Sequence, residues 1–218
     1  MLALVLVSFL LTYYVPLLRS TKQFGALRHI HGLVFFGWMF LYVWQTQLVA
    51  REKVNRHREI GLLGCVLAGA LLVLGVWMAL HAAGERAASG ATRPYEFTWY
   101  NLLDLILFAG FVLGAITTAT RRTDWHRRLM YIAALSLVAP AFSRWTLLLP
   151  LPSPWLDMAP NLIIDVFLVA LVLHDRKNLG AVHIGTWTGI IVTVPLHIVS
   201  PWIAMGGWWN HIAPRLLS

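Results

Sequence analysis

Seven apolar segments, each about as long as a helix that crosses a bilayer, constrain this chain more than any other feature. A bilayer core about 30 Å thick is crossed by roughly 20 mostly apolar residues in helical form. The segments are Leu2–Leu18, Ile30–Ala50, Ile60–Leu80, Trp99–Ala119, Leu129–Leu149, Leu156–Leu173 and Ile184–Met205. The pattern predicts an all-α, polytopic membrane protein that forms a bundle of about seven transmembrane helices.

The composition agrees with this class. Of the 218 residues, 59% are hydrophobic and 12% are charged, whereas soluble domains carry about 25% charged residues. So few charged groups cannot cover a water-facing surface. The connections are short, and the longest is expected over His81–Thr98. We therefore expect residues 1–218 to form a single integral-membrane domain whose main partner is the lipid bilayer.

The basic residues predict an orientation. The loops after the second, fourth and sixth segments hold ten of the 17 lysines and arginines, and the opposite side holds six. Cytoplasmic loops are enriched in these residues, so we expect a cytoplasmic N-terminus and a C-terminus outside. This distribution also explains the net charge of +8 without a nucleic-acid partner, because no nucleic-acid-binding motif accompanies it.

The residues that several classes of membrane protein and enzyme require are absent from this sequence. The lysines, Lys22, Lys53 and Lys177, all lie outside the apolar segments, which excludes a retinal Schiff base. The HExxH and GxSxG signatures of metalloproteases and serine hydrolases are absent. One cysteine, Cys65, gives neither a disulfide framework nor a cysteine metal site.

Four polar groups interrupt the apolar segments at a similar distance from the expected outer face. A charged group in a bilayer costs about 2.5–3.5 kcal/mol on insertion scales and usually faces a partner or a cavity. We expect a buried polar network of Asp104, Arg144, Asp165 and His197. It would act either as an ion pair that locks the helices together or as an outward-facing proton, quinone or ligand site.

Two histidines near the outer face suit a cofactor. His31 begins the second segment and His81 ends the third, so two antiparallel helices would hold them at one level. Two neutral histidines on neighbouring helices are the ligand set of haem b. A transition metal ion is the other candidate, with His29 as a further ligand. The alternative is that these histidines bind lipid headgroups.

A second set of histidines lies beside arginines at the expected inner face. Three of them, His57, His126 and His183, begin outgoing helices. The positive end of a helix dipole keeps an imidazole neutral, as a metal ligand must be. The set is therefore a metal-site candidate. A His-Arg turn is more commonly an interfacial anchor whose arginines contact phosphate headgroups.

The turns RHREIG and WHRRLMYIAAL carry a family resemblance. They are similar to the His-Arg-Arg/Lys-Leu-Met turn of small bacterial multi-pass membrane families, one of which includes a terminal-oxidase assembly factor (CtaM). The similarity covers residues 125–145 and, more loosely, the hairpin 29–61. It implies a multi-pass protein of the bacterial inner membrane, associated with haem–copper respiration, and it carries over His126 as a motif position.

Together these observations lead to one expected function and two alternatives. The expected function is a redox-associated protein of a bacterial energy-converting membrane. It would bind haem b, a metal ion or a quinone, or help to assemble a respiratory complex, and its partners would be subunits of that complex. The alternatives are a cofactor-free structural accessory subunit and a small proton-coupled transporter that uses the network of Asp104, Arg144, Asp165 and His197.

Overall fold

All regular structure is helical in the described part of the computed structural model, residues 2–21, 23–146, 148–150, 152 and 155–217. This confirms the all-α prediction. The elements are α1 (Leu2–Ser8), η1 (Leu10–Tyr14), α2 (Val15–Leu18), α3 (Ala26–Ala50), α4 (Val54–Ala88), α5 (Glu96–Thr118), α6 (Thr123–Ser136), α7 (Ala139–Thr146), α8 (Trp155–Leu179), α9 (Ile184–Met205) and α10 (Gly207–Leu217).

Five of these helices, α3, α4, α5, α8 and α9, are long and apolar enough to cross a membrane. They overlap five of the seven predicted segments, and α9 has the predicted bounds. Large apolar side chains on these helices are exposed in the isolated chain; examples are Leu33, Leu62, Ile106, Val166 and Ile191. Exposed apolar surface on bilayer-length helices is the pattern of lipid contact.

The other two predicted segments are interrupted. The first is divided into α1, the π-helical turn η1 and α2. The fifth is divided into α6 and α7, and its residue 147 lies outside the described residues. Pro140 explains the second break. In a helix its ring would clash with the carbonyl group four residues earlier, which is that of Ser136, the last residue of α6. The count of seven spans therefore stays a prediction.

The predicted loop His81–Thr98 is wrong in its first half. Helix α4 continues to Ala88, so His81 lies two turns inside the helix and not at its end. The residues 81–88 are rich in alanine, a strong helix former, and this outweighs their polarity. An unpredicted helix, α10, follows α9 and carries Trp208 and Trp209.

The chain divides into two compact units, Met1–Met78 and Ala79–Ser218, here called the N-terminal unit and the C-terminal unit. In the N-terminal unit, α3 and α4 contact each other through Leu41 and Gly64. The ring of Phe9 packs against Phe35 and Phe36, with centroid distances of 6.0 and 5.2 Å, and so attaches the first helical segment to α3.

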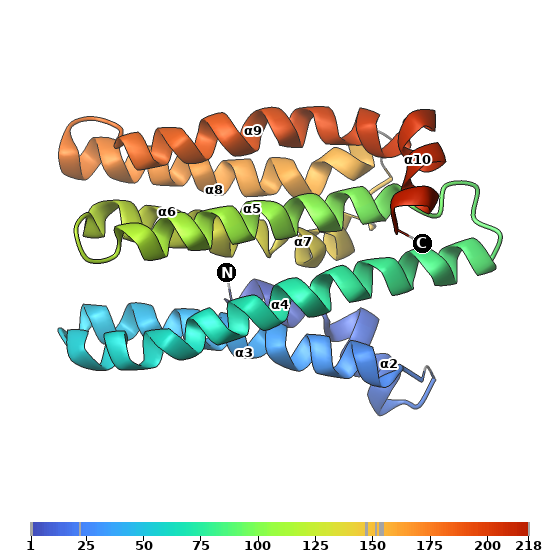
Figure 1. Cartoon of the computed structure of the whole chain (residues 1–218), viewed down its shortest axis with the longest axis horizontal. Coiled ribbons are helices and arrows are strands. Elements are labelled where there is room, and N and C mark those ends of the chain that lie inside the picture. Colours follow the sequence, from blue (N-terminus) through green and yellow to red (C-terminus); the bar gives the residue numbers. More distant parts are fainter. Residues whose placement is uncertain (1, 22, 147, 151, 153–154, 218) are drawn as a thin grey trace. The chain divides into compact units, whose positions relative to one another are not determined.

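In the C-terminal unit, α5 turns back into α6, and α8 turns back into α9, at the same end (Figure 1). We call this the turn end, and we call the opposite end, where α10 lies, the α10 end. Gly180 allows the α8–α9 turn because its φ of +73° lies in the left-handed region that favours glycine. Fully buried apolar side chains fill the middle of the unit; they are Phe108, Ile132, Leu135, Ile164 and Leu168.

One glycine brings two helices of the C-terminal unit unusually close. A Cβ atom on Gly189 of α9 would overlap the side chain of Ile132 on α6. At Gly114 of α5 a Cβ atom would lie 3.2 Å from Leu129 Cδ1. Small residues let membrane helices approach closely, and Gly189 therefore sets the distance between α6 and α9.

Candidate functional site

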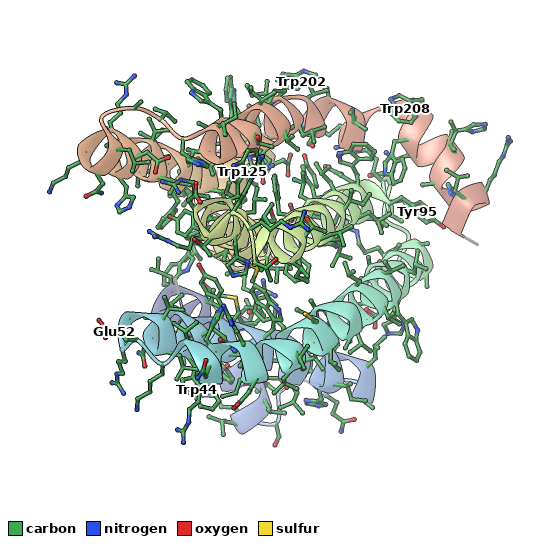
Figure 2. All side chains as sticks on the ribbon, turned by 60° about the vertical axis from the view of Figure 1, so that its left-hand side comes forward. Trp44, Glu52, Tyr95, Trp125, Trp202 and Trp208 are labelled. Atoms are coloured by element: carbon green, nitrogen blue, oxygen red, sulfur yellow. The ribbon has the colours of Figure 1, made fainter. Side chains whose placement is uncertain are left out.

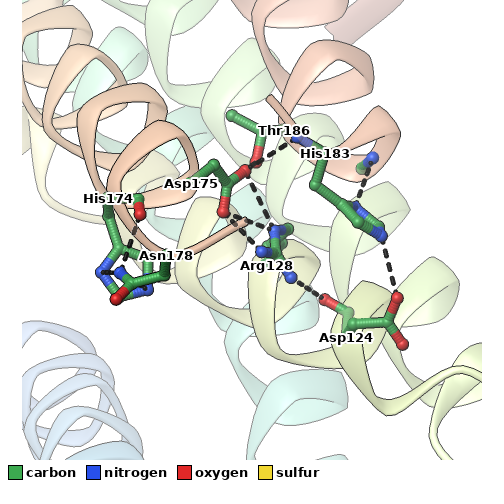
Figure 3. Close-up of polar contacts among 8 residues, drawn as sticks. Asp124, Arg128, His174, Asp175, Asn178, His183 and Thr186 are labelled. Atoms are coloured by element: carbon green, nitrogen blue, oxygen red, sulfur yellow. Dashed lines mark hydrogen bonds and ion pairs between the residues drawn. The ribbon is translucent and has the colours of Figure 1, made fainter. Parts of the chain in front are cut away.

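A buried ion pair holds the turn end of the C-terminal unit together (Figure 3). The Arg128 side chain is 7% exposed and the Asp175 side chain is 0% exposed. Arg128 Nε donates to both carboxylate oxygens of Asp175, at 3.1 and 3.2 Å, and Nη2 donates to Oδ1. Because both groups are shielded from water, each depends on the other for its hydrogen bonds.

Asp175 also accepts hydrogen bonds from α9. The Thr186 hydroxyl donates to Oδ2 at 2.5 Å, and the backbone N–H of His183 donates to the same oxygen at 3.1 Å. Arg128 Nη1 donates to the backbone carbonyl of Asp124 at 2.9 Å. One carboxylate therefore connects α6, α8 and the start of α9, and it is fully hydrogen-bonded in doing so.

His183 is the N-cap of α9 and has a defined tautomer. Its Nδ1 accepts from the backbone N–H of Gly185 at 2.9 Å, so the ring proton sits on Nε2 and is donated to Asp124 Oδ2 at 2.9 Å. The pKa of Asp124 lies below its ordinary value because its own backbone N–H and then the His183 ring stabilise the carboxylate. Both ring nitrogens of this metal-ligand candidate thus have protein partners.

The other two inner-face candidates also contact protein groups. His126 Nδ1 forms a hydrogen bond of 2.8 Å with the Ala115 carbonyl of α5, which fixes the α5–α6 turn. The Gln45 amide, oriented with its nitrogen toward α4, donates to His57 Nδ1 and accepts from the Gly61 N–H at 3.1 Å. His57 and His126 lie in the first turns of α4 and α6, as predicted.

The outer-face candidates fall in both units. In the N-terminal unit, His29 Nδ1 forms a hydrogen bond of 2.6 Å with the Tyr13 hydroxyl, whereas His31 Nδ1 is buried without a hydrogen-bond partner among the described residues. In the C-terminal unit, His81 Nε2 lies 3.4 Å from Glu85 Oε1, and both side chains are about half exposed. The bis-histidine haem site of His31 and His81 stays a prediction.

Two members of the predicted polar network are in direct contact. His197 Nδ1 on α9 lies 2.8 Å from Asp165 Oδ1 on α8, and their side chains are 3% and 17% exposed. Asp165 lies ten residues after Trp155 and His197 eight residues before Met205. With a rise of about 1.5 Å per residue, the pair lies about 12–15 Å from the α10 end of these helices.

The other two members of the predicted network, Asp104 and Arg144, form no hydrogen bond with this pair within the described residues. Asp104 is buried on α5, eight residues after Glu96 and so at a similar depth. Within the described residues its carboxyl forms neither a hydrogen bond nor an ion pair. Arg144, in the last turn of α7, donates from Nη1 to the Pro140 carbonyl. The structure thus joins Asp165 to His197.

Sequence reasoning missed the buried pair of Arg128 and Asp175, whose carboxylate accepts hydrogen bonds from both α6 and α9. Arg128 was counted only among the basic residues of the orientation signal, and Asp175 was assigned no role. A signal was available: Asp175 is an acid among basic residues, and Arg128 directly precedes the apolar segment that begins at Leu129. The described residues contain no group of three or more His, Cys, Asp or Glu side chains placed to hold a metal ion.

Comparison of the chain with protein-family models, with curated proteins and with solved structures found no match.

Proposed function

We propose that this protein carries protons, alone or together with a solute, through the pair formed by Asp165 and His197. One observation supports this function most directly: a carboxyl and an imidazole, hydrogen-bonded at 2.8 Å, lie inside two bilayer-length helices. Ionisable groups at such depth are energetically costly and usually belong to ion pathways or proton relays.

The pair has the chemistry for this task. A proton can reside on the carboxyl of Asp165 or on the imidazole of His197, and the hydrogen bond between them is a route for its transfer. Asp104 on the neighbouring α5 is a third titratable group at a similar depth. It is a suitable acceptor for a proton that leaves the pair.

The two ends of the C-terminal unit differ in a way that suits one-sided access. At the turn end, Asp175 binds α6, α8 and α9 together. The pair itself joins α8 to α9, and it lies nearer to the α10 end of these two helices. We propose that protons reach the pair from the α10 end, which is the outer face if the protein has the predicted N-in, C-out orientation in a bacterial inner membrane.

The test is proton movement into liposomes that contain the purified protein. The liposomes enclose a pH-sensitive dye, and a potassium gradient with valinomycin drives proton entry. We expect entry above that of protein-free liposomes, and its loss in Asp165→Asn and His197→Ala. Glu59→Gln, which neutralises an exposed carboxylate instead, should retain the wild-type rate. Wild-type entry in a folded Asp165→Asn variant, or no entry with the wild-type protein, would refute the proposal.

His31 favours a second candidate function, the binding of a redox cofactor. Its Nδ1 is buried and has no hydrogen-bond partner within the described residues, and a buried polar atom without a partner is destabilising. Coordination of haem b or a transition metal would remove that cost, and His29, two residues earlier, is a further donor. This function would suit a protein that serves respiratory complexes or a quinone.

A spectrum of the gently purified protein tests the second candidate. A Soret band that sharpens on reduction with dithionite and disappears in His31→Ala would identify a haem protein, and metal analysis of the same sample covers the metal ions. Tyr13→Phe is the control, because it removes a neighbouring partner of His29 and leaves His31 intact. A colourless, metal-free protein would contradict this function, and failure of both tests would favour a structural accessory subunit.

A further inference from the structure

Buried polar atoms without hydrogen-bond partners gather at the α10 end of the C-terminal unit. In the described part of the chain five side-chain atoms are of this kind, and four belong to this end: Arg86 Nε, Tyr100 Oη, Asp157 Oδ2 and Asn210 Oδ1. They come from the last turn of α4, the second turn of α5, and the first turns of α8 and α10. Each costs about 1–3 kcal/mol when it lacks a partner, so their concentration on four helices indicates a ligand site.

Charges of both signs surround these atoms. The Glu96 carboxyl, on a residue that is 8% exposed, lies 3.5 Å from Arg93 Nε. Glu96 also interacts electrostatically with Asp157 and Arg86, and Tyr100 interacts with Asp157, Glu96 and Arg93. The cluster therefore holds two carboxylates and two guanidinium groups within electrostatic range of one another.

Arg86 and Asn210 are oriented so that some of their polar atoms can bind a ligand. The guanidinium of Arg86 lies 4.6 Å from the centre of the Phe97 ring, which fixes the group without using its N–H donors. Asn210 uses its Nδ2 to donate to the carbonyls of Ala204 and Gly206 at 3.0 and 3.2 Å. Its Oδ1 is then an acceptor with no protein donor. The site thus offers a cationic donor and a separate set of oxygen acceptors.

A zwitterion matches this set better than a simple ion. An anion would meet the carboxylates of Glu96 and Asp157, and a metal cation would meet the guanidinium groups of Arg86 and Arg93. A group with a phosphate at one end and an ammonium at the other satisfies both halves. Guanidinium binds phosphate through charge-assisted hydrogen bonds, and an ammonium has three N–H donors for the carboxylates and for Asn210 Oδ1.

Tryptophans beside the cluster place it at the level of lipid headgroups. Trp99, Trp208 and Trp209 pack edge to face, with centroid distances between 5.2 and 6.5 Å. Trp209 Nε1 donates to the Tyr95 carbonyl at 2.9 Å. Trp202 points away from the helices (Figure 2), and Trp202 and Trp208 are both more than half exposed. Tryptophan is enriched where a membrane protein meets the interface.

We propose that the α10 end binds the headgroup of phosphatidylethanolamine, with its phosphate on Arg86 and Arg93 and its ammonium on Glu96 and Asp157. The Tyr100 hydroxyl donates to the phosphate, and Asn210 Oδ1 accepts from the ammonium. The acyl chains then lie along the exposed apolar sides of the helices. This site goes beyond the proposed proton function and does not depend on it, because none of these residues belongs to the Asp165–His197 pair.

The first experiment compares lipids on the unmodified protein. Native mass spectrometry of the detergent-solubilised chain is titrated with short-chain phosphatidylethanolamine, phosphatidylcholine or phosphatidylglycerol. Phosphatidylcholine keeps the phosphate but has no ammonium N–H, and phosphatidylglycerol has no cation. We expect phosphatidylethanolamine to bind about tenfold more tightly than either. Equal binding of the three lipids would overturn the proposal and leave only ordered water at the site.

The second experiment assigns the two halves of the headgroup. Asp157→Asn should weaken phosphatidylethanolamine binding about tenfold and leave phosphatidylglycerol unchanged, whereas Arg86→Gln should weaken both. Glu85→Gln and Arg215→Gln, which alter exposed charges near the same end, are the matched controls. Unchanged phosphatidylethanolamine binding in a folded Asp157→Asn variant would refute the site. If soluble phosphoethanolamine binds as tightly as the lipid, the proposal that the ligand is a membrane lipid is wrong.

Discussion

Loss of the Asp175 carboxylate is expected to destabilise the protein more than any other single charge change at the turn end. Asp175→Leu leaves the Arg128 guanidinium, 7% exposed, without its counter-ion. It also leaves the Thr186 hydroxyl and the His183 N–H without their acceptor. Breaking a buried ion pair in this way costs about 3–5 kcal/mol, which shifts the unfolding equilibrium by a factor on the order of 10² to 10³ or more.

The measurement is equilibrium unfolding of the detergent-solubilised protein with dodecyl sulfate, followed by tryptophan fluorescence. The double variant Arg128→Met/Asp175→Leu should be more stable than Asp175→Leu alone, because it removes the uncompensated charge. The matched control is Arg127→Met, an exposed neighbour that should change the free energy of unfolding by less than about 0.5 kcal/mol.

Two outcomes would contradict this reasoning. The first is a loss of less than about 1 kcal/mol in Asp175→Leu, a value typical of exposed ion pairs. The second is strict additivity of the two single changes in the double variant, because residues in one hydrogen-bonded pair should couple.

Three further predictions concern single contacts. Gly189→Ala should destabilise the fold by about 1–3 kcal/mol through overlap with Ile132, and adding Ile132→Val to this variant should recover part of the loss. Thermal unfolding measures the effect, and a Gly189→Ala variant as stable as the wild-type protein would contradict the contact. His126→Ala should cost about 1 kcal/mol by removing the bond to the α5 carbonyl, and hydrogen exchange should increase at the α5–α6 turn alone. Because the pKa of Asp124 is lowered by its own N–H and by His183, its stabilising effect should vanish as the pH falls through that lowered pKa. The wild-type and Asp124→Asn unfolding midpoints should then converge in acid. A difference between the two midpoints that grows as the pH falls would contradict this prediction.

The sequence by itself determined the class of the protein and the position of most helices. A polypeptide in a bilayer must satisfy its backbone hydrogen bonds within the segment, so a long apolar stretch can only be a helix. This is why α9 has its predicted bounds and why every end of α3, α5 and α8 lies less than two helical turns from the predicted one. Where a proline or a polar end intervened, as in α6, α7 and α4, the boundaries predicted from hydropathy were wrong.

The partners of the polar groups were decided only by the tertiary structure. Sequence spacing gave a common depth to Asp104, Asp165 and His197, because depth follows from the helical rise. Spacing does not give the rotation of one helix about its axis relative to the next. That rotation joins Asp165 to His197 and leaves Asp104 outside their hydrogen bond.

The same reason explains Arg128 and Asp175. Each lies near a basic turn, and a sequence does not distinguish an arginine that faces headgroups from one that faces a carboxylate on another helix. Only the packing of α6 against α8 shows that these two side chains face each other. The polar atoms at the α10 end come from helix turns that are spread over more than 100 residues of the chain, so packing alone assembles that site.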